Sequence, residues 1–129
     1  MRSFAAHYIC SGPGILMAKQ TICLDDEGCV CAVQPFRDER ASTVFLNGVI
    51  CPAFGLPGGN QLLTPDEATS LIRRVKNVDS SITVTDFLEF YITLSALKIG
   101  VRPVLWCIEP LDLKNLLLLD GSSVYSVFP

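Results

Sequence analysis

The sequence predicts an α+β fold that is mainly β: a small β-sandwich or partly open barrel built from both chain ends, with two helices inserted between them. Three observations predict it. Short apolar runs separated by turn residues fill residues 1–54, a glycine- and proline-rich linker covers 55–63, and helical patterns occupy 64–100 before strand patterns return in 101–129. A chain of 129 residues makes one domain, so we expect residues 1–129 to fold as a unit.

Turn residues divide the N-terminal half into strands. The acidic residues 25–27 followed by Gly28 are typical of a hairpin turn, because glycine takes a positive φ at no steric cost. Asn47-Gly48 is a type I′ turn signal between two short apolar runs. Residues 35–42 read as a charged loop. Tight turns between short strands predict an antiparallel sheet.

The first helix has a clear start. Thr64 is a good N-cap, Pro65 fits the first helical position, and Glu67 completes a capping box. A second helix is expected to begin after Thr83 or Thr85 and to run to about Lys98, with Gly100 as its stop signal. It is apolar on nearly every side, so we expect it to be buried nearly all round.

Composition excludes several classes of function. The chain has 10 Lys+Arg against 13 Asp+Glu, and this net charge of −3 argues against binding nucleic acid through its phosphates. Half of the residues are apolar and 18% are charged, which predicts a folded core rather than disorder. No apolar run is long enough to span a membrane, and the N-terminus is a poor signal peptide. We therefore expect a cytoplasmic protein without a membrane or nucleic-acid partner.

Six cysteines lie in apolar, strand-like runs: Cys10, Cys23, Cys29, Cys31, Cys51 and Cys107. This context favours reduced thiols that pack as small hydrophobes over a disulfide framework. Cys29-x-Cys31 places two thiols on one face of a strand, where they are weak candidates for a soft metal. A structural zinc site needs four ligands, so core packing is the preferred interpretation and no cofactor is expected.

Catalytic residues are scarce. His7 is the single histidine, so a Ser-His-Asp or Cys-His mechanism within one chain must use it. A thiol enzyme based on Cys51 or Cys107 remains open as an alternative, with Arg102 as the basic group nearest in sequence. The glycines of the linker lack the spacing and the lysine of a phosphate-binding loop. These residues lean against an enzyme without deciding the question.

Two stretches resemble the amidohydrolase superfamily, and they are most similar to its cytosine/guanine deaminase and chlorohydrolase-like members. The first joins Phe-Ala-Ala-His-Tyr-Ile and Gly-x-Gly-Ile-Leu in 4–16, Leu-Asp-Asp-x-Gly in 24–28 and Asn-Gly-Val-Ile-Cys-Pro-Ala-Phe in 47–54. The second covers 88–116 and resembles the last barrel helix and the C-terminal return. In that family, such segments build a composite β-sandwich domain beside a catalytic (β/α)₈ barrel.

The resemblance also implies what this chain lacks. In the family, the segment like residues 51–54 leads into a His-x-His metal motif, and the corresponding positions here are Gly58 and Asn60. A (β/α)₈ barrel needs about 200 residues or more. The resemblance therefore implies a non-catalytic amidohydrolase-like β-domain with its metal centre absent, which acts through protein–protein contacts. The alternatives are an accessory or regulatory partner of a metal-dependent amidohydrolase or deaminase, and a remnant of such a hydrolase.

Self-association is expected through the second helix, which the barrel covers in the family. Without a barrel, its large apolar side chains would form a surface patch beyond what monomers usually tolerate. A two-fold homodimer is the simplest cover, and the first helix of the same chain is the alternative. The expected interface residues are Phe87, Phe90, Tyr91 and Leu94.

Overall fold

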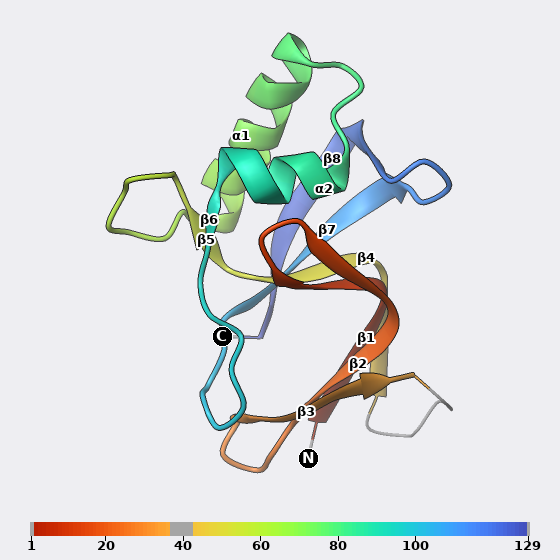
Figure 1. The fold of residues 1–129 in the computed structure, drawn as a ribbon, viewed down its shortest axis with the longest axis vertical. Coiled ribbons are helices and arrows are strands. Elements are labelled where there is room, and N and C mark those ends of the chain that lie inside the picture. The colour runs from red at the N-terminus through yellow and green to blue at the C-terminus, as the bar shows by residue number, and fades with distance from the viewer. Residues whose placement is uncertain (1, 37–42, 129) are drawn as a thin grey trace.

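The computed structural model describes residues 2–36 and 43–128. Within these residues, six strands form the main sheet in the order β3-β2-β1-β4-β7-β8 (Figure 1). The bounds of its strands are β1 (Arg2–Gly12), β2 (Ile15–Leu24), β3 (Val30–Pro35), β4 (Thr43–Pro52), β7 (Leu105–Asp112) and β8 (Leu117–Phe128). The predicted α+β, mainly β, class is confirmed. The charged loop predicted at 35–42 falls mostly on 37–42, outside the described residues.

Between β4 and β7 the described chain forms its helices and a small second sheet. The bounds of these elements are β5 (Phe54–Gly55), α1 (Pro65–Val78), α2 (Val84–Asp86), the π-helix η1 (Phe87–Tyr91) and β6 (Thr93–Leu94). β5 pairs with β6 in an antiparallel register. None of the helices among the described residues is long and apolar enough to cross a membrane.

β4 joins the two ends of the chain. It pairs in parallel with β1, where Ile9 lies opposite Ile50, and antiparallel with β7, where Ile50 lies opposite Cys107. N-terminal and C-terminal strands therefore share one sheet, as the sequence predicts. The expected wholly antiparallel sheet is wrong for the β1–β4 pair. After the β1–β2–β3 meander, the chain returns to the free side of β1 and runs in the same direction as β1.

The turn predicted at Asn47-Gly48 is also wrong, because β4 runs through both residues. The register between β1 and β4 shifts between Ala6 and Tyr8, which lie opposite this part of β4. A Cβ atom at Gly48 would collide with the carbonyl oxygen of Ile108 in β7. Glycine is therefore needed here so that the β7 backbone can approach closely, which is a recurrent reason for glycine inside a strand.

The main sheet curls, and the curl encloses a hydrophobic cluster (Figure 1). The Phe128 ring at the end of β8 lies 6.2 Å from the Phe4 ring in β1. A Cβ at Gly28, in the β2–β3 turn, would also touch Phe128. β8 thus reaches the first strands across the interior, as in a partly open barrel. The buried side chains inside are Phe4, Ala6, Ile9, Ile22, Leu24, Val30, Ile50, Leu105 and Phe128.

Helix α1 covers the opposite face of the sheet, and its start is the predicted one. Thr64 Oγ1 accepts a hydrogen bond from the Glu67 amide, and the Glu67 carboxylate accepts one from the Thr64 amide. Polar groups then tie the helix to β8. The Val124 amide donates to Thr69 Oγ1 at 2.9 Å, and Lys76 Nζ donates to a β8 carbonyl at 2.8 Å. The helix buries its own side chains Ala68, Ile72 and Val75.

The second helix is much shorter than predicted, because it ends at Tyr91 instead of near residue 98. Ile92 has extended backbone angles, with φ −142° and ψ 167°. Leu94 then pairs with Phe54 of β5, and the Ser95 amide and hydroxyl both donate to the Ala53 carbonyl. Pairing with β5 therefore outweighs the apolar pattern that favoured a helix. β-branched side chains at positions 92 and 93 also fit a strand better than a helix.

We predict that Gly48→Ala lowers the free energy of unfolding by about 1–3 kcal/mol, because the added methyl group meets a fixed backbone carbonyl. Gly121→Ala is the matched control, since a Cβ at that position has no atom within 4 Å, and its effect should stay within about 0.5 kcal/mol. Urea denaturation measures both. Equal stability of the two variants would contradict the role assigned to Gly48.

Candidate interaction surface

One side of η1 packs in the hydrophobic core, and the element carries two aromatic side chains at the surface. Thr83 Oγ1 caps the preceding α2 by accepting a hydrogen bond from the Asp86 amide. Phe87 is 0% exposed and its ring packs edge-on against Phe54, with ring centroids 6.0 Å apart. The Tyr91 ring stacks on the Phe87 ring at 6.3 Å. This packing fixes η1 and orients the Tyr91 ring before any partner binds.

The structure separates the four residues predicted as an interface. Phe90 is 66% exposed and Tyr91 is 36% exposed, so both reach the surface. Phe87 is fully buried in the chain's own core, and its assignment to the surface is corrected here. Leu94 is half-buried in β6. The helix was also expected to be buried nearly all round, which the exposure of Phe90 contradicts.

The predicted linker 55–63 forms a hydrogen-bonded loop beside β6. The Leu63 amide donates to the Phe54 carbonyl, and the Gly59 amide donates to the Leu56 carbonyl. Gly55 is buried, and a Cβ there would collide with the Gln61 carbonyl. The composition of this segment signals a turn-rich connection. It does not reveal that the two ends of the loop are hydrogen-bonded together.

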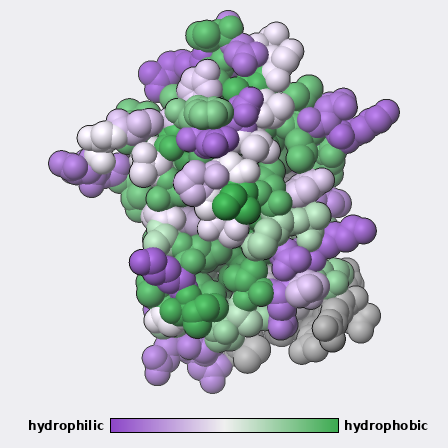
Figure 2. Space-filling view, in the orientation of Figure 1, coloured by the Kyte–Doolittle hydropathy of each residue, from purple (hydrophilic) through white to green (hydrophobic). Residues whose placement is uncertain are grey.

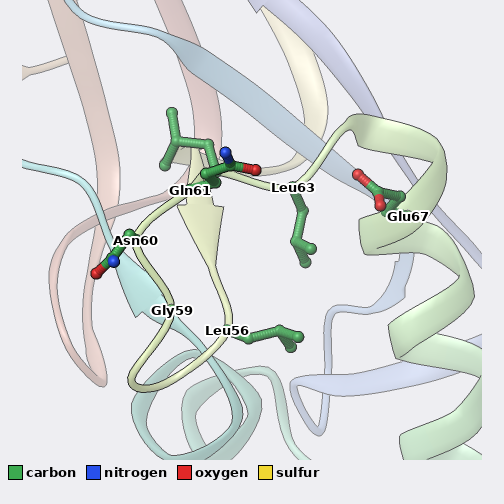
Figure 3. Close-up of a pocket in the computed structure, with 7 residues that line it drawn as sticks. Leu56, Gly59, Asn60, Gln61, Leu63 and Glu67 are labelled. Carbon is green, nitrogen blue, oxygen red and sulfur yellow. The ribbon is translucent and has the colours of Figure 1, made fainter.

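The loop borders a hollow of about 460 Å³ next to the start of α1. Figure 3 shows Leu56 and Leu63 on the side of the loop that faces α1 and Glu67, with Asn60 pointing the other way. A smaller hollow of about 160 Å³ lies between this loop and β6, and Leu56, Leu62 and Leu94 help to line it. We call Leu56, Leu62, Phe90 and Tyr91 the η1 surface. The two leucines were not predicted.

Other exposed apolar side chains lie elsewhere on the molecule. Figure 2 shows hydrophobic side chains over the middle and lower part of one face, where the β1–β2 hairpin and the segment between β6 and β7 lie. Ile15 is exposed on the hairpin, and Ile99 and Val101 are exposed on that segment. No aromatic side chain is among these three. The η1 surface differs from these three residues in carrying two exposed aromatic rings.

The cysteine pair considered for metal binding is not packed in the core. Cys29 is half-buried in the turn before β3, and Cys31 is exposed in β3. The expected core packing is therefore wrong for Cys31. Within residues 2–36 and 43–128, no group of three or more histidine, cysteine or acidic side chains is placed to hold a metal ion. Asp25 has the predicted turn role, because its Oδ1 accepts hydrogen bonds from the Glu27 and Cys29 amides.

Three other thiols are buried in neighbouring strands of the main sheet: Cys10 in β1, Cys51 in β4 and Cys107 in β7. Burial raises the pKa of Cys10 to about 11 and the pKa of Cys107 to about 12. Burial, followed by the neighbouring thiols Cys10 and Cys107, also raises the pKa of Cys51. These groups stay protonated at neutral pH, which is the opposite of what an activated thiol nucleophile needs.

The basic group considered for a thiol enzyme has other partners. Arg102 Nη1 donates to the Glu27 carbonyl at 3.3 Å, and the guanidinium lies 5.5 Å from the centre of the Phe128 ring. Cys107 instead contacts Glu109, with Sγ 3.8 Å from the carboxylate. The His7 ring packs edge-on against Phe45 at 5.2 Å. Because burial keeps the Cys107 thiol protonated, its contact with Glu109 does not make it an activated nucleophile.

No protein-family model, curated protein or solved structure matches this chain. The amidohydrolase resemblance therefore rests on the sequence motifs and stays a prediction.

We predict that the protein loses stability in mild alkali. The folded state keeps the buried thiols protonated above the pKa of an unfolded thiol, so each contributes stability below about pH 8.5 that fades as the pH rises. Each thiol adds a slope of about 1.4 kcal/mol per pH unit while only the unfolded chain ionises. Urea denaturation at about pH 8 and pH 10 measures this slope.

The matched variants for this slope are Cys51→Ala and Cys31→Ala. Cys51→Ala removes a buried thiol and should make the slope shallower, whereas Cys31→Ala removes an exposed thiol and should leave it unchanged. The same slope in all three proteins would show that the buried thiols do not govern the alkaline response.

Proposed function

We propose that this chain is a non-catalytic β-domain that acts through protein–protein contacts made by the η1 surface. The observation that supports this is the outward Phe90–Tyr91 pair on an element whose other side is fixed by Phe87 in the core. Aromatic side chains are enriched at the centres of protein interfaces. A ring that is already stacked loses less conformational freedom on binding.

The proposed partner is a second copy of this chain. In a two-fold contact each copy offers the same surface, so the proposed contact sets the exposed Phe90 ring of one copy against the exposed Leu56 and Leu62 of the other, and the reverse contact forms with it. Burying one such ring contributes roughly 1.5–3 kcal/mol.

The proposed relationship is to the composite β-domain of the amidohydrolase superfamily. Its support is that β4, which carries most of the motif in 47–54, lies between a strand of the first resembling stretch and a strand of the second. Gly58 and Asn60, at the positions of the family's metal motif, are both exposed on the loop. A metal-dependent amidohydrolase or deaminase is therefore the alternative partner for the same surface.

We predict a concentration-dependent dimer that Phe90→Asp weakens by at least about tenfold in Kd, because a charge replaces a ring at the proposed centre. Val78→Asp is the matched control: Val78 is 86% exposed at the far end of α1, outside the η1 surface. Sedimentation equilibrium over a micromolar concentration series measures both variants, and circular dichroism confirms that each is folded.

Two results would contradict the homodimer. One is a wild-type protein that stays monomeric throughout the series, and the other is an equal loss of association in Val78→Asp. If the monomer instead binds a purified amidohydrolase and Phe90→Asp abolishes that binding, the η1 surface is an interface for the alternative partner and not for a second copy.

A further inference from the structure

The pairing of β2 with β3 contains an irregularity at a cysteine. Leu24 lies opposite Val30, and the next pair is Cys23 opposite Ala32, so Cys31 is an extra residue in β3. Such a bulge sets two residues of one strand against a single residue of its neighbour. Cys31 is therefore held beside Cys23, although the sequence places these residues on different strands.

Distances support a close approach of the two cysteines. Cys31 Sγ lies 3.3 Å from the backbone carbonyl oxygen of Cys23 and donates a weak hydrogen bond to it. Ala32 is the residue that faces Cys23, and the bulge sets its neighbour Cys31 against Cys23 as well. A disulfide between the two cysteines requires their Cα atoms to lie roughly 4.4–6.8 Å apart.

The Cys23 sulfur acts as a hydrogen-bond acceptor in its two side-chain contacts. It accepts from Ser3 Oγ at 3.5 Å and from Gln34 Nε2 at 3.7 Å. Neither contact uses the thiol hydrogen, so losing that hydrogen removes no donor from these two contacts. Only the weak S–H···O contact made by Cys31 is lost on oxidation.

Access to the two thiols is unequal. Cys31 is exposed on β3, which is an edge strand of the main sheet, whereas Cys23 is 7% exposed beneath it. A reagent from solvent therefore meets Cys31 first. The thiols of Cys10, Cys51 and Cys107 are buried and offer no comparable route.

We propose that Cys23 and Cys31 form a redox-active dithiol whose substrate is a low-molecular-weight disulfide of the glutathione type. The Cys31 thiolate attacks one sulfur of the substrate, forms a mixed disulfide and releases the first small thiol. Cys23 then attacks the Cys31 sulfur, closes the Cys23–Cys31 disulfide and releases the second small thiol. Two electrons and two hydrogens pass from the protein to the substrate, which is reduced to two thiols.

The test treats the reduced, full-length protein with oxidised glutathione, unfolds it in denaturant, blocks the remaining thiols there with N-ethylmaleimide and measures the intact mass. Of the six cysteines, all but one pair should be alkylated, and the pair should regain alkylation after reduction. Cys23→Ser should stop at a mixed disulfide with glutathione on Cys31. Cys31→Ser should carry neither modification at Cys23.

Cys29→Ser is the matched control, because Cys29 lies close to the pair in sequence and has an intermediate exposure. It should form the same disulfide as the wild type. The proposal is overturned if Cys29→Ser abolishes the disulfide, if Cys23→Ser still closes one, or if the wild type forms none in excess oxidised glutathione. Matching circular dichroism spectra establish that each variant has the native fold.

Discussion

The pairing of β4 with β1 on one side and with β7 on the other determines the rest of the structure. Along β4, Val49 faces the cluster beneath the helices and Ile50 faces the cluster inside the curl. Both hydrophobic clusters therefore depend on one strand having both of its neighbours. That requires the β7 backbone to approach closely at Gly48, where any side chain would meet a carbonyl oxygen. The segment between β4 and β7 can then fold as helices and a loop on one face.

Local signals predicted the elements that are stabilised locally. The capping box at Thr64 and Glu67 and the turn around Asp25 depend on neighbours in sequence, and the structure has both. The Asn47-Gly48 signal failed because a glycine is equally suited to a turn and to a close backbone contact. The second helix failed because its last residues pair with β5, a contact between segments far apart in the sequence.

The candidate sites follow the same division. The periodicity around η1 identified Phe90 and Tyr91, but it could not tell which ring of the cluster faces the core, since that depends on Phe54 in another strand. The loop leucines were hidden in a segment whose composition indicates only a linker. The Cys23–Cys31 proximity depends on a bulge, and a bulge leaves no periodic signal in either strand.

The contact between Phe4 and Phe128 bears on how the protein is made in the cell. These rings lie at opposite ends of the described chain, so the ribosome delivers one long before the other. Until then, β8 does not cover the inner face of β1, and apolar side chains that are buried in the native state are exposed to solvent. The curl of the sheet therefore cannot close before the segment that carries Phe128 has left the ribosome, and the apolar strands made earlier stay exposed until then.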